Sequence, residues 1–193
     1  MAINGDGFTP WWSRTLLDYY PHVGDPVSLT GFAASRGEVY SRVNPGNPTL
    51  FISRPNAITT GKHNGPIFNA ISGLNLMLES GRTIISPRFD EKEPHPRTAM
   101  GLDKSGRSLI VLIVDGRQPH YSEGMLLPEL ADLMREFGIY DGINLDGGGS
   151  TTLAVWLADG MAGASLKRSR PLLLYSVLRL RSSLSMRSTR LST

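Results

Sequence analysis

An uninterrupted run of six apolar residues, from Leu109 to Val114, constrains the fold of this chain more than any other feature. A strand of that composition is typically buried on both faces, because successive side chains point to opposite sides of a sheet. Residues 98–102 are also strand-like, and a turn sequence at 103–107 separates the two segments. We therefore predict a hairpin over residues 98–114, and a strong hairpin argues against a purely parallel sheet.

The clearest helix is predicted over about 127–137, with Pro128 in its first turn and Gly138 at its end. Apolar residues recur there at spacings of three or four, which gives the helix one apolar face. Shorter strand-like segments lie at residues 29–33, 50–53, 74–78, 142–145 and 151–157. Because strands outnumber helices, we predict a single-domain α+β fold with a mixed or antiparallel β-sheet core and a few flanking helices.

Cysteine usage and charge exclude several classes of protein. The 193 residues include no cysteine, which excludes a disulfide scaffold, a zinc ribbon and a thiol enzyme. The formal net charge is +3, but seven basic residues and no acidic one lie from Lys167 onward. Without those seven, residues 1–166 hold 13 basic and 17 acidic residues, a net charge of −4. The body of the chain therefore lacks the basic footprint of a nucleic-acid-binding protein.

The two ends of the chain differ from its centre. Residues 1–7 lack the basic and apolar regions of a signal peptide, and no apolar run reaches the roughly 18 residues of a membrane span. Either the chain stays where it is made or its export signal lies outside this sequence, and we expect a bacterial cytoplasmic or phage-particle protein without a membrane partner. We predict a domain over 1–162 and a basic, Ser/Arg/Leu-rich tail over 163–193 that is atypical or partly disordered, with one strand-like stretch at 172–178.

The densest cluster of chemically useful side chains follows the strand-like segment 142–145. It consists of Asn144, Asp146, Gly147, Gly148, Gly149, Ser150, Thr151 and Thr152. Three glycines let the backbone turn back on itself and approach a ligand, and successive N–H groups in such a loop form an anion-binding concavity. The cluster therefore combines a carboxylate with a phosphate-sized cradle; the alternative interpretation is a Gly-rich turn capped by an aspartate.

Three smaller clusters stand beside predicted strands. They are Arg97 with Thr98, Asp115 to Arg117, and Asn4, Gly5 and Asp6. An arginine on a rigid strand suits bidentate recognition of phosphate, and polar residues at the end of a buried strand are well placed for a site. The alternatives are a surface arginine in the first case and ordinary turns in the other two. The four histidines share no metal-ligand spacing.

Read together, these pieces resemble the phosphodiester glycosidase family. The matching motifs are Asn-Gly-x-Gly-Phe at 4–8, Pro-Arg-Thr-Ala-x-Gly at 96–101, Asp-Gly-Arg at 115–117, Leu-x-Glu-Leu-Ala at 127–131 and Asn-Leu-Asp-Gly-Gly-Gly-Ser at 144–150. The resemblance covers about residues 1–157. Two departures stand out: Asp6 is inserted among the first glycines, and the segment after Arg170-Pro171 does not match the family's closing strand, as a frameshifted or truncated end would explain.

The resemblance implies hydrolysis of a sugar-1-phosphodiester, similar to an N-acetylglucosamine-1-phosphodiester, at the anomeric carbon with release of free sugar. The partner would be a phosphorylated carbohydrate or glycoconjugate, and no cofactor is expected. Asp146 would be nucleophile or general base, Asp115 or Asp6 the second carboxylate, and Arg97 a phosphate ligand. The implied substrate-binding residues are Asn4, Gly5, Thr98, Arg117, Asn144, Gly147, Gly148, Gly149, Ser150 and Thr151. Retention and inversion of configuration both remain open.

Two other functions remain as alternatives. A non-catalytic glycan- or phosphate-binding module on the same fold would keep the Gly-rich cradle without using its carboxylate. A metal-dependent phosphoesterase would use Asp6, Asp115 and Asp146 as ligands of a divalent cation.

Overall fold

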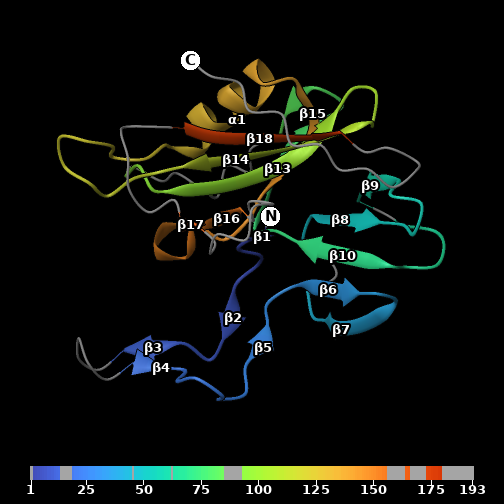
Figure 1. Cartoon of the computed structure of the whole chain (residues 1–193), viewed down its shortest axis with the longest axis horizontal. Helices are drawn as coiled ribbons and strands as arrows, with labels where there is room; N and C mark the ends of the chain where they lie inside the picture. The colour runs from blue at the N-terminus through green and yellow to red at the C-terminus, as the bar shows by residue number, and fades with distance from the viewer. Residues whose placement is uncertain are drawn as a thin grey trace.

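The structure, a computed structural model, describes residues 2–13, 19–44, 46–61, 63–84, 93–155, 164–165 and 173–179. A six-stranded antiparallel sheet lies at its centre (Figure 1). In spatial order its strands are β12 (Arg82–Thr83), β11 (Asn75–Glu79), β15 (Ile139–Asn144), β13 (Arg97–Asp103), β14 (Ser108–Val114) and β18 (Leu173–Arg179). The predicted hairpin is confirmed as β13 and β14, and a strand is present within the strand-like stretch near 172–178.

The turn of this hairpin is organised by Asp103. Its carboxylate accepts hydrogen bonds from the N–H groups of Arg107 and Ser108, at 2.9 and 3.1 Å, and from the Ser105 hydroxyl at 2.7 Å. Partial burial acts to raise the pKa of Asp103, but these hydrogen bonds stabilise the charged form more, and they hold the pKa below its ordinary value. The charged carboxylate therefore stabilises the turn that sets the register of the two buried strands.

One face of the six-stranded sheet is covered by α1 (Leu127–Glu136), which confirms the predicted helix. The Leu126 N–H donates to the Glu129 carboxylate at 2.8 Å, which satisfies one of the amides left open at the helix start. Gly138 adopts a φ of 79° just beyond the helix, a conformation that glycine allows at little cost. The buried face of the helix consists of Leu127, Leu130, Ala131 and Met134.

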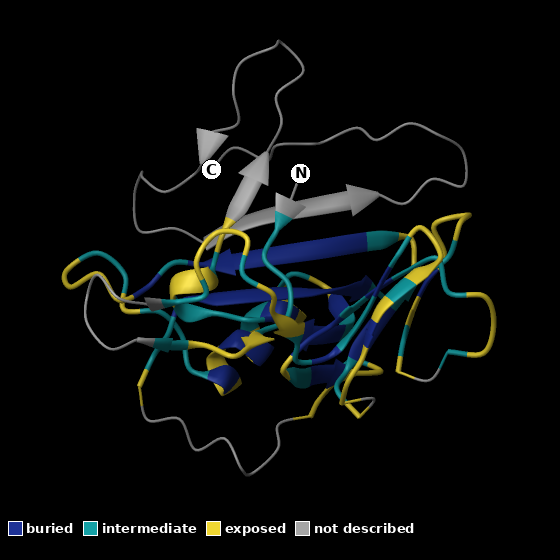
Figure 2. Cartoon of the chain, turned by 90° about the horizontal axis from the view of Figure 1, so that it is seen from below, coloured by how far each residue is buried: buried dark blue, intermediate teal, exposed yellow. Residues whose placement is uncertain are grey.

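The opposite face is covered by a five-stranded antiparallel sheet (Figure 1). Its strands, in spatial order, are β7 (Glu38–Arg42), β6 (Phe32–Ser35), β10 (Asn69–Ser72), β8 (Thr49–Ile52) and β9 (Ile58–Thr60). Strand β14 contributes to both interfaces: Ile110, Leu112 and Val114 pack with the helix, whereas Leu109, Val111 and Ile113 pack toward the second sheet. The prediction that this strand is buried on both faces is confirmed. Figure 2 shows buried strands, in dark blue, through the centre of the molecule.

The remaining strands form small sheets. They are β1 (Ala2–Ile3) with β16 (Leu153–Val155) and β17 (Ala164–Ser165), β2 (Phe8–Thr9) with β5 (Ser28–Leu29), and β3 (Trp12–Ser13) with β4 (Tyr19–Tyr20). The pairing of β1 with β16 brings the start of the chain beside the segment that follows the Gly-rich loop. A short 3-10 helix, η1 (Gly148–Ser150), lies within that loop.

The fold is richer in β-structure than the predicted α+β class. Every strand pair between described residues is antiparallel, and α1 is the single α-helix among the described ranges. The physical reason is that a second sheet, and not a layer of helices, buries the other face of the central sheet. No helix in the described part of the chain is long and apolar enough to cross a membrane.

Two segment predictions need qualification. The strand expected over 29–33 is divided into the end of β5 and the start of β6, because Thr30 turns away and its N–H and hydroxyl both donate to Gly7 O, at 3.0 and 2.8 Å. Residues 153–155 of the strand expected over 151–157 form β16, and residues 156–157 lie outside the described residues. The division into 1–162 and 163–193 stays a prediction.

Candidate active site

The antiparallel pairing of the central strands brings the predicted clusters to one edge of the sheet. Strand β13 begins at Arg97, opposite Val114 at the end of β14. Strand β15 runs in the opposite direction to β13 and ends at Asn144, opposite Ala99. The residues just before β13 and just after β14 and β15 therefore meet at the same edge, although up to 50 positions separate them in the sequence.

Asn4 connects three of these segments through its side-chain amide. Its Oδ1 accepts hydrogen bonds from the Thr98 hydroxyl at 2.8 Å and from the Thr152 N–H at 3.1 Å. Its Nδ2 donates to the backbone oxygen of Asp146 at 2.6 Å. The Asp146 N–H in turn donates to Gly5 O at 3.0 Å. Both backbone polar groups of Asp146 are therefore held by the segment at the start of the chain.

The Asp146 carboxylate is half-buried at the centre of this arrangement. Its Oδ1 accepts a hydrogen bond from the N–H of Gly147 at 2.9 Å, and no described residue donates to its Oδ2. One carboxylate oxygen is thus fixed by the loop, while the other is left to interact with a substrate. That combination orients the group without neutralising it, as a nucleophile or a general base requires.

Gly147 is required by a close contact with the segment before β13, and Gly148 by its backbone conformation. A Cβ on Gly147 would stand 2.7 Å from Pro96 O. Gly148 has a φ of 62°, and its N–H donates to the same Pro96 oxygen at 2.9 Å. The N–H groups of Gly147 and Gly148 are therefore already bonded within the protein. Of the three glycine amides expected to cradle an anion, the N–H of Gly149 is the one that has no hydrogen bond to a described residue.

Arg117 supplies a positive charge directly above the loop. Its guanidinium nitrogens lie 3.1 and 3.2 Å from the position of a Cβ on Gly148, so that only a glycine fits beneath it without displacing the side chain. Arg117 is exposed, and its Nη2 lies 3.5 Å from Nδ1 of His95. The side chain is held over the loop and still faces solvent, which suits the recognition of a phosphate group.

Arg97, the other predicted phosphate ligand, is only 5% exposed. Its Nε donates to Met125 O at 2.9 Å, which ties the start of β13 to the segment that precedes α1. The structure therefore places Arg97 beneath the edge of the sheet and Arg117 on its surface. Of the two arginines, Arg117 has the geometry to meet a ligand first.

The other two candidate carboxylates differ in how many hydrogen bonds they already accept. Asp6 Oδ1 accepts from Gly7 N–H at 2.8 Å and Thr30 Oγ1 at 3.1 Å, and its Oδ2 accepts from Ser72 Oγ at 2.6 Å. Asp115 Oδ1 accepts from the Gly116 N–H and from Gln118 Nε2, both at 2.9 Å, and its Oδ2 has no partner among the described residues. Both oxygens of Asp6 therefore accept hydrogen bonds, whereas Asp115 has one oxygen without a partner among the described residues.

These carboxylates do not converge on a metal site. Within the described ranges, no group of three or more His, Cys, Asp and Glu side chains is arranged to hold a metal ion. Asp6, Asp115 and Asp146 are all described, so together they do not form the ligand set that the metal-dependent alternative needs. Asp6 is instead held by the Gly7 N–H and by the hydroxyls of Thr30 and Ser72.

The remaining predicted residues are divided between the interior and the surface. Asn144 is 2% exposed; its Nδ2 donates to Asn75 Oδ1 at 3.3 Å, and its Oδ1 is buried without a hydrogen-bond partner among the described residues. The buried Thr151 hydroxyl oxygen likewise has no partner in the described part of the chain, whereas Ser150 is exposed. Asn144 therefore lies beneath the site, and Ser150 is the hydroxyl that a ligand can reach.

Several residues that shape the site have no signature in the sequence. Ser72 and Thr30 fix Asp6, and Met125 fixes Arg97 through a backbone oxygen. His95 stands beside Arg117. Each of these residues acts across the tertiary structure, so no local pattern marks it. Thr152, which completes the contacts of Asn4, belongs instead to the hydroxyl run that the sequence does show.

Comparisons with known proteins point to one family. The family model for phosphodiester glycosidase matches residues 1–173. Among solved structures, the catalytic domain of zebrafish N-acetylglucosamine-1-phosphodiester alpha-N-acetylglucosaminidase, auto-inhibited by its pro-peptide, is similar to this chain at 26% identity and a TM-score of 0.55. That alignment covers 78% of this chain and 57% of the zebrafish chain.

A hypothetical protein from Synechocystis aligns with a TM-score of 0.40 and 17% identity, over 68% of this chain and 34% of that one. A search of curated proteins finds no match. The aligned part of the present chain thus spans a little over half of the zebrafish chain.

Proposed function

The chain belongs to the phosphodiester glycosidase family, and we propose that it hydrolyses a sugar-1-phosphodiester at the anomeric carbon and releases the free sugar. The observation that supports this proposal most is the position of Asp146. One of its oxygens is fixed by the loop, and the other has no partner among the described residues. The guanidinium of Arg117 lies over Gly148 in the same loop. A carboxylate and a cation beside the same loop suit the two ends of a glycosyl phosphate bond.

The chemistry of the leaving group explains why these two charges suffice. A phosphate monoester leaves readily, so the reaction depends less on a strong general acid than ordinary glycoside hydrolysis does. What it needs is stabilisation of negative charge on the phosphate and a carboxylate near the anomeric carbon. Arg117 would neutralise the phosphate, with the Gly149 N–H as an additional donor. Buried Arg97 would act beneath them by holding the start of β13 in place.

In the overall reaction, water supplies the oxygen that bonds to the anomeric carbon. The bond between that carbon and the phosphate oxygen breaks, and the phosphate monoester leaves with the bonding electrons. The proton of the water is taken up by a carboxylate. Asp146 serves either as that base or as the nucleophile of a two-step reaction, and Asp115, with its unpaired oxygen, is better placed than Asp6 to be the second carboxylate.

The hydrogen bonds of Asp6 indicate a positioning role and not a role as the second carboxylate of the reaction. Both of its oxygens are occupied by donors from three other residues, so it positions the Asn4–Gly5 segment, which in turn holds the backbone of Asp146. Ser150, Asn4 and Thr98 line the same edge. We propose that the exposed Ser150 hydroxyl contacts the sugar, whereas Asn4 and the buried Thr98 act by supporting Asp146.

The substrate class that we propose is based on the name of the zebrafish protein. The zebrafish protein is named for an N-acetylglucosamine-1-phosphodiester, and we propose a substrate of that type, a carbohydrate joined through its anomeric oxygen to a phosphodiester.

The test is to incubate the full chain with a panel of sugar-1-phosphodiesters and with aryl glycosides of the same sugars, with and without a chelator. Free sugar released from the phosphodiesters alone, and unaffected by chelator, is the expected result. Absence of turnover by protein shown to be folded would contradict the proposal and favour a glycan- or phosphate-binding module on this fold.

A further inference from the structure

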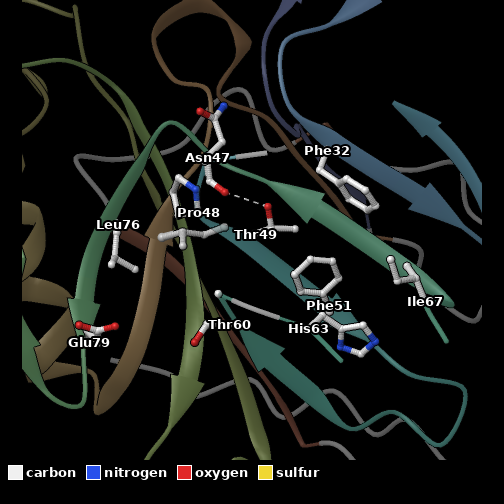
Figure 3. A pocket seen from close by; sticks show the side chains of 13 residues that line it. Phe32, Asn47, Pro48, Thr49, Phe51, Thr60, His63, Ile67, Leu76 and Glu79 are labelled. Atoms are coloured by element: carbon white, nitrogen blue, oxygen red, sulfur yellow. Dashed lines mark hydrogen bonds between the residues drawn. The ribbon is translucent and has the colours of Figure 1, made fainter. Parts of the chain in front are cut away.

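A pocket of about 530 Å³ lies between the two large sheets, apart from the residues described above. Such a volume is typical of small-molecule sites, which range from about 300 to 1,000 Å³. Figure 3 shows Asn47 and Pro48 at one end and Glu79 and Thr60 toward the other. Most of the lining side chains are half-buried, so the pocket is walled by residues that solvent and ligands can reach.

The wall of the pocket combines aromatic rings with a few polar groups. The Phe51 ring stacks on the His63 ring, with centroids 4.8 Å apart and planes inclined by 17°, and the Phe32 ring lies 5.7 Å from Phe51. Leu76 continues the apolar surface. The Thr60 hydroxyl and the Glu79 carboxylate have no hydrogen-bond partner among the described residues, and the structure leaves both available to a ligand.

This composition fits a carbohydrate better than an anion or a purely apolar molecule. A sugar ring presents C–H groups on its faces, which pack against aromatic rings, and hydroxyls at its rim, which need hydrogen-bond acceptors and donors. A carboxylate accepts hydrogen bonds from hydroxyls but repels phosphate. The pocket therefore suits a neutral or amino sugar and not the phosphate end of the substrate.

The pocket is connected to the proposed active site by a short series of contacts. Ser72 donates its hydroxyl to Asp6, and the next residue, Gly73, donates its N–H to Pro48 O at 2.8 Å in the pocket wall. A Cβ on Gly73 would stand 2.5 Å from Asn144 O, two residues before Asp146. Asp6 is thus linked to the Pro48 end of the pocket through Ser72 and Gly73, whereas Arg117 and Gly148 lie on the far side of Asp146.

From its active-site end the pocket extends along β11. Leu76 and Glu79 line it from the same strand, three positions apart, which corresponds to about 10 Å at about 3.3 Å per residue. That length exceeds what a single substituent on the reacting sugar needs. It matches a further ring joined to that sugar on the side away from the phosphate.

We propose that this pocket is a second carbohydrate subsite, which holds a sugar unit attached to the sugar whose anomeric bond is cleaved. This inference rests on the proposed function for its orientation, because Arg117 is taken to mark the phosphate end. In the protein's working substrate the phosphodiester would then terminate an oligosaccharide. The Phe51 ring would pack against the added sugar, and Thr60 and Glu79 would bind its hydroxyls.

The test compares two substrates with the same phosphodiester group, one built on N-acetylglucosamine and one on N,N′-diacetylchitobiose. Loss of an aromatic contact corresponds to about a two- to tenfold change in binding. We expect Phe51→Leu, which keeps apolar volume but removes the ring, to raise KM for the disaccharide substrate by that factor. Glu79→Gln should act in the same direction, and Glu38→Gln, an exposed carboxylate of β7 outside the pocket, is the control. KM for the monosaccharide substrate should not change in any of the three variants.

A second readout does not depend on turnover. Amide signals of Phe51, Thr60 and Glu79 in the isotope-labelled full chain should shift on addition of free N,N′-diacetylchitobiose. Shifts at the pocket without hydrolysis of either substrate would refute the proposed function and support the pocket as a carbohydrate site. Hydrolysis with the same effect of Phe51→Leu on both substrates, and no shifts at the pocket, would overturn the subsite and leave the proposed function intact.

Discussion

Replacing Asn4 by alanine should disable the site while leaving the fold intact. The substitution removes three hydrogen bonds, to Thr98, Thr152 and Asp146 O. At a net value of about 1 kcal/mol each, their loss lowers the free energy of unfolding by about 3 kcal/mol. The Thr98 hydroxyl adds to this cost, because it is fully buried and loses its acceptor. Total stabilities of about 5–15 kcal/mol leave such a variant folded.

The effect on catalysis should be larger than the effect on stability suggests. Asn4 holds the backbone oxygen of Asp146, and a displacement of about 1 Å at a reacting group costs roughly 100-fold in rate. We expect Asn4→Ala to lower kcat for a sugar-1-phosphodiester by about that factor, measured beside urea unfolding of the same sample. Asn64→Ala, in an exposed loop position, is the matched control. Wild-type stability together with wild-type kcat in Asn4→Ala would refute the argument.

Three further substitutions test separate parts of the account. Gly148 has a φ of 62°, and Gly148→Ala places a methyl group against the Arg117 guanidinium, so KM for the phosphodiester should rise by about tenfold or more in steady-state assays. Gly149→Ala is the control, because a Cβ there has no atom within 4 Å, and its KM should stay near wild type. Gly31→Ala would overlap the Asp6 carboxylate, and thermal unfolding should show a clear loss of stability. Because the pKa of Asp103 is lowered in the folded state, its stabilising effect is complete above the unfolded pKa of about 3.9 and is lost as pH falls through the folded pKa. Asp103→Asn should therefore reduce the free energy of unfolding at pH 6 more than at pH 3, and an equal loss at both would contradict this.

The parts of the fold that could be predicted from the sequence are those that local patterns determine. The apolar run at 109–114 and the spacing of apolar residues in 127–137 each specify a strand or a helix within one segment, and both elements are present. The prediction of a few helices exceeds the single α-helix among the described residues, because no local pattern shows that a second sheet covers the back of the first. That the ends of β14 and β15 meet the start of β13 at one edge depends on the pairing of β13 with β15, which no local pattern shows.

The state of individual groups in the site could not be predicted in the same way. The sequence offers three consecutive glycine amides after Asp146, but two of them are used by Asp146 itself and by Pro96. Asp6 and Asp115 have similar sequence surroundings, yet only Asp6 meets a hydroxyl from a residue 66 positions away. Arg97 is buried and Arg117 is exposed, and the residues around each in the sequence do not show this difference. These distinctions depend on tertiary contacts, which decide whether a polar group is occupied or available.

The most direct measurement of the central claim is the rate of sugar release from a sugar-1-phosphodiester by Asp146→Asn, beside wild type and Asp132→Asn. Asp132 is an exposed carboxylate on α1 that pairs with Arg135, so its substitution controls for loss of a negative charge. Asparagine retains the size of the side chain and an oxygen to accept the Gly147 N–H, but it can be neither nucleophile nor base. We predict folded protein with release abolished in Asp146→Asn and unchanged in Asp132→Asn. Wild-type release by Asp146→Asn would contradict the claim that this loop carries the chemistry.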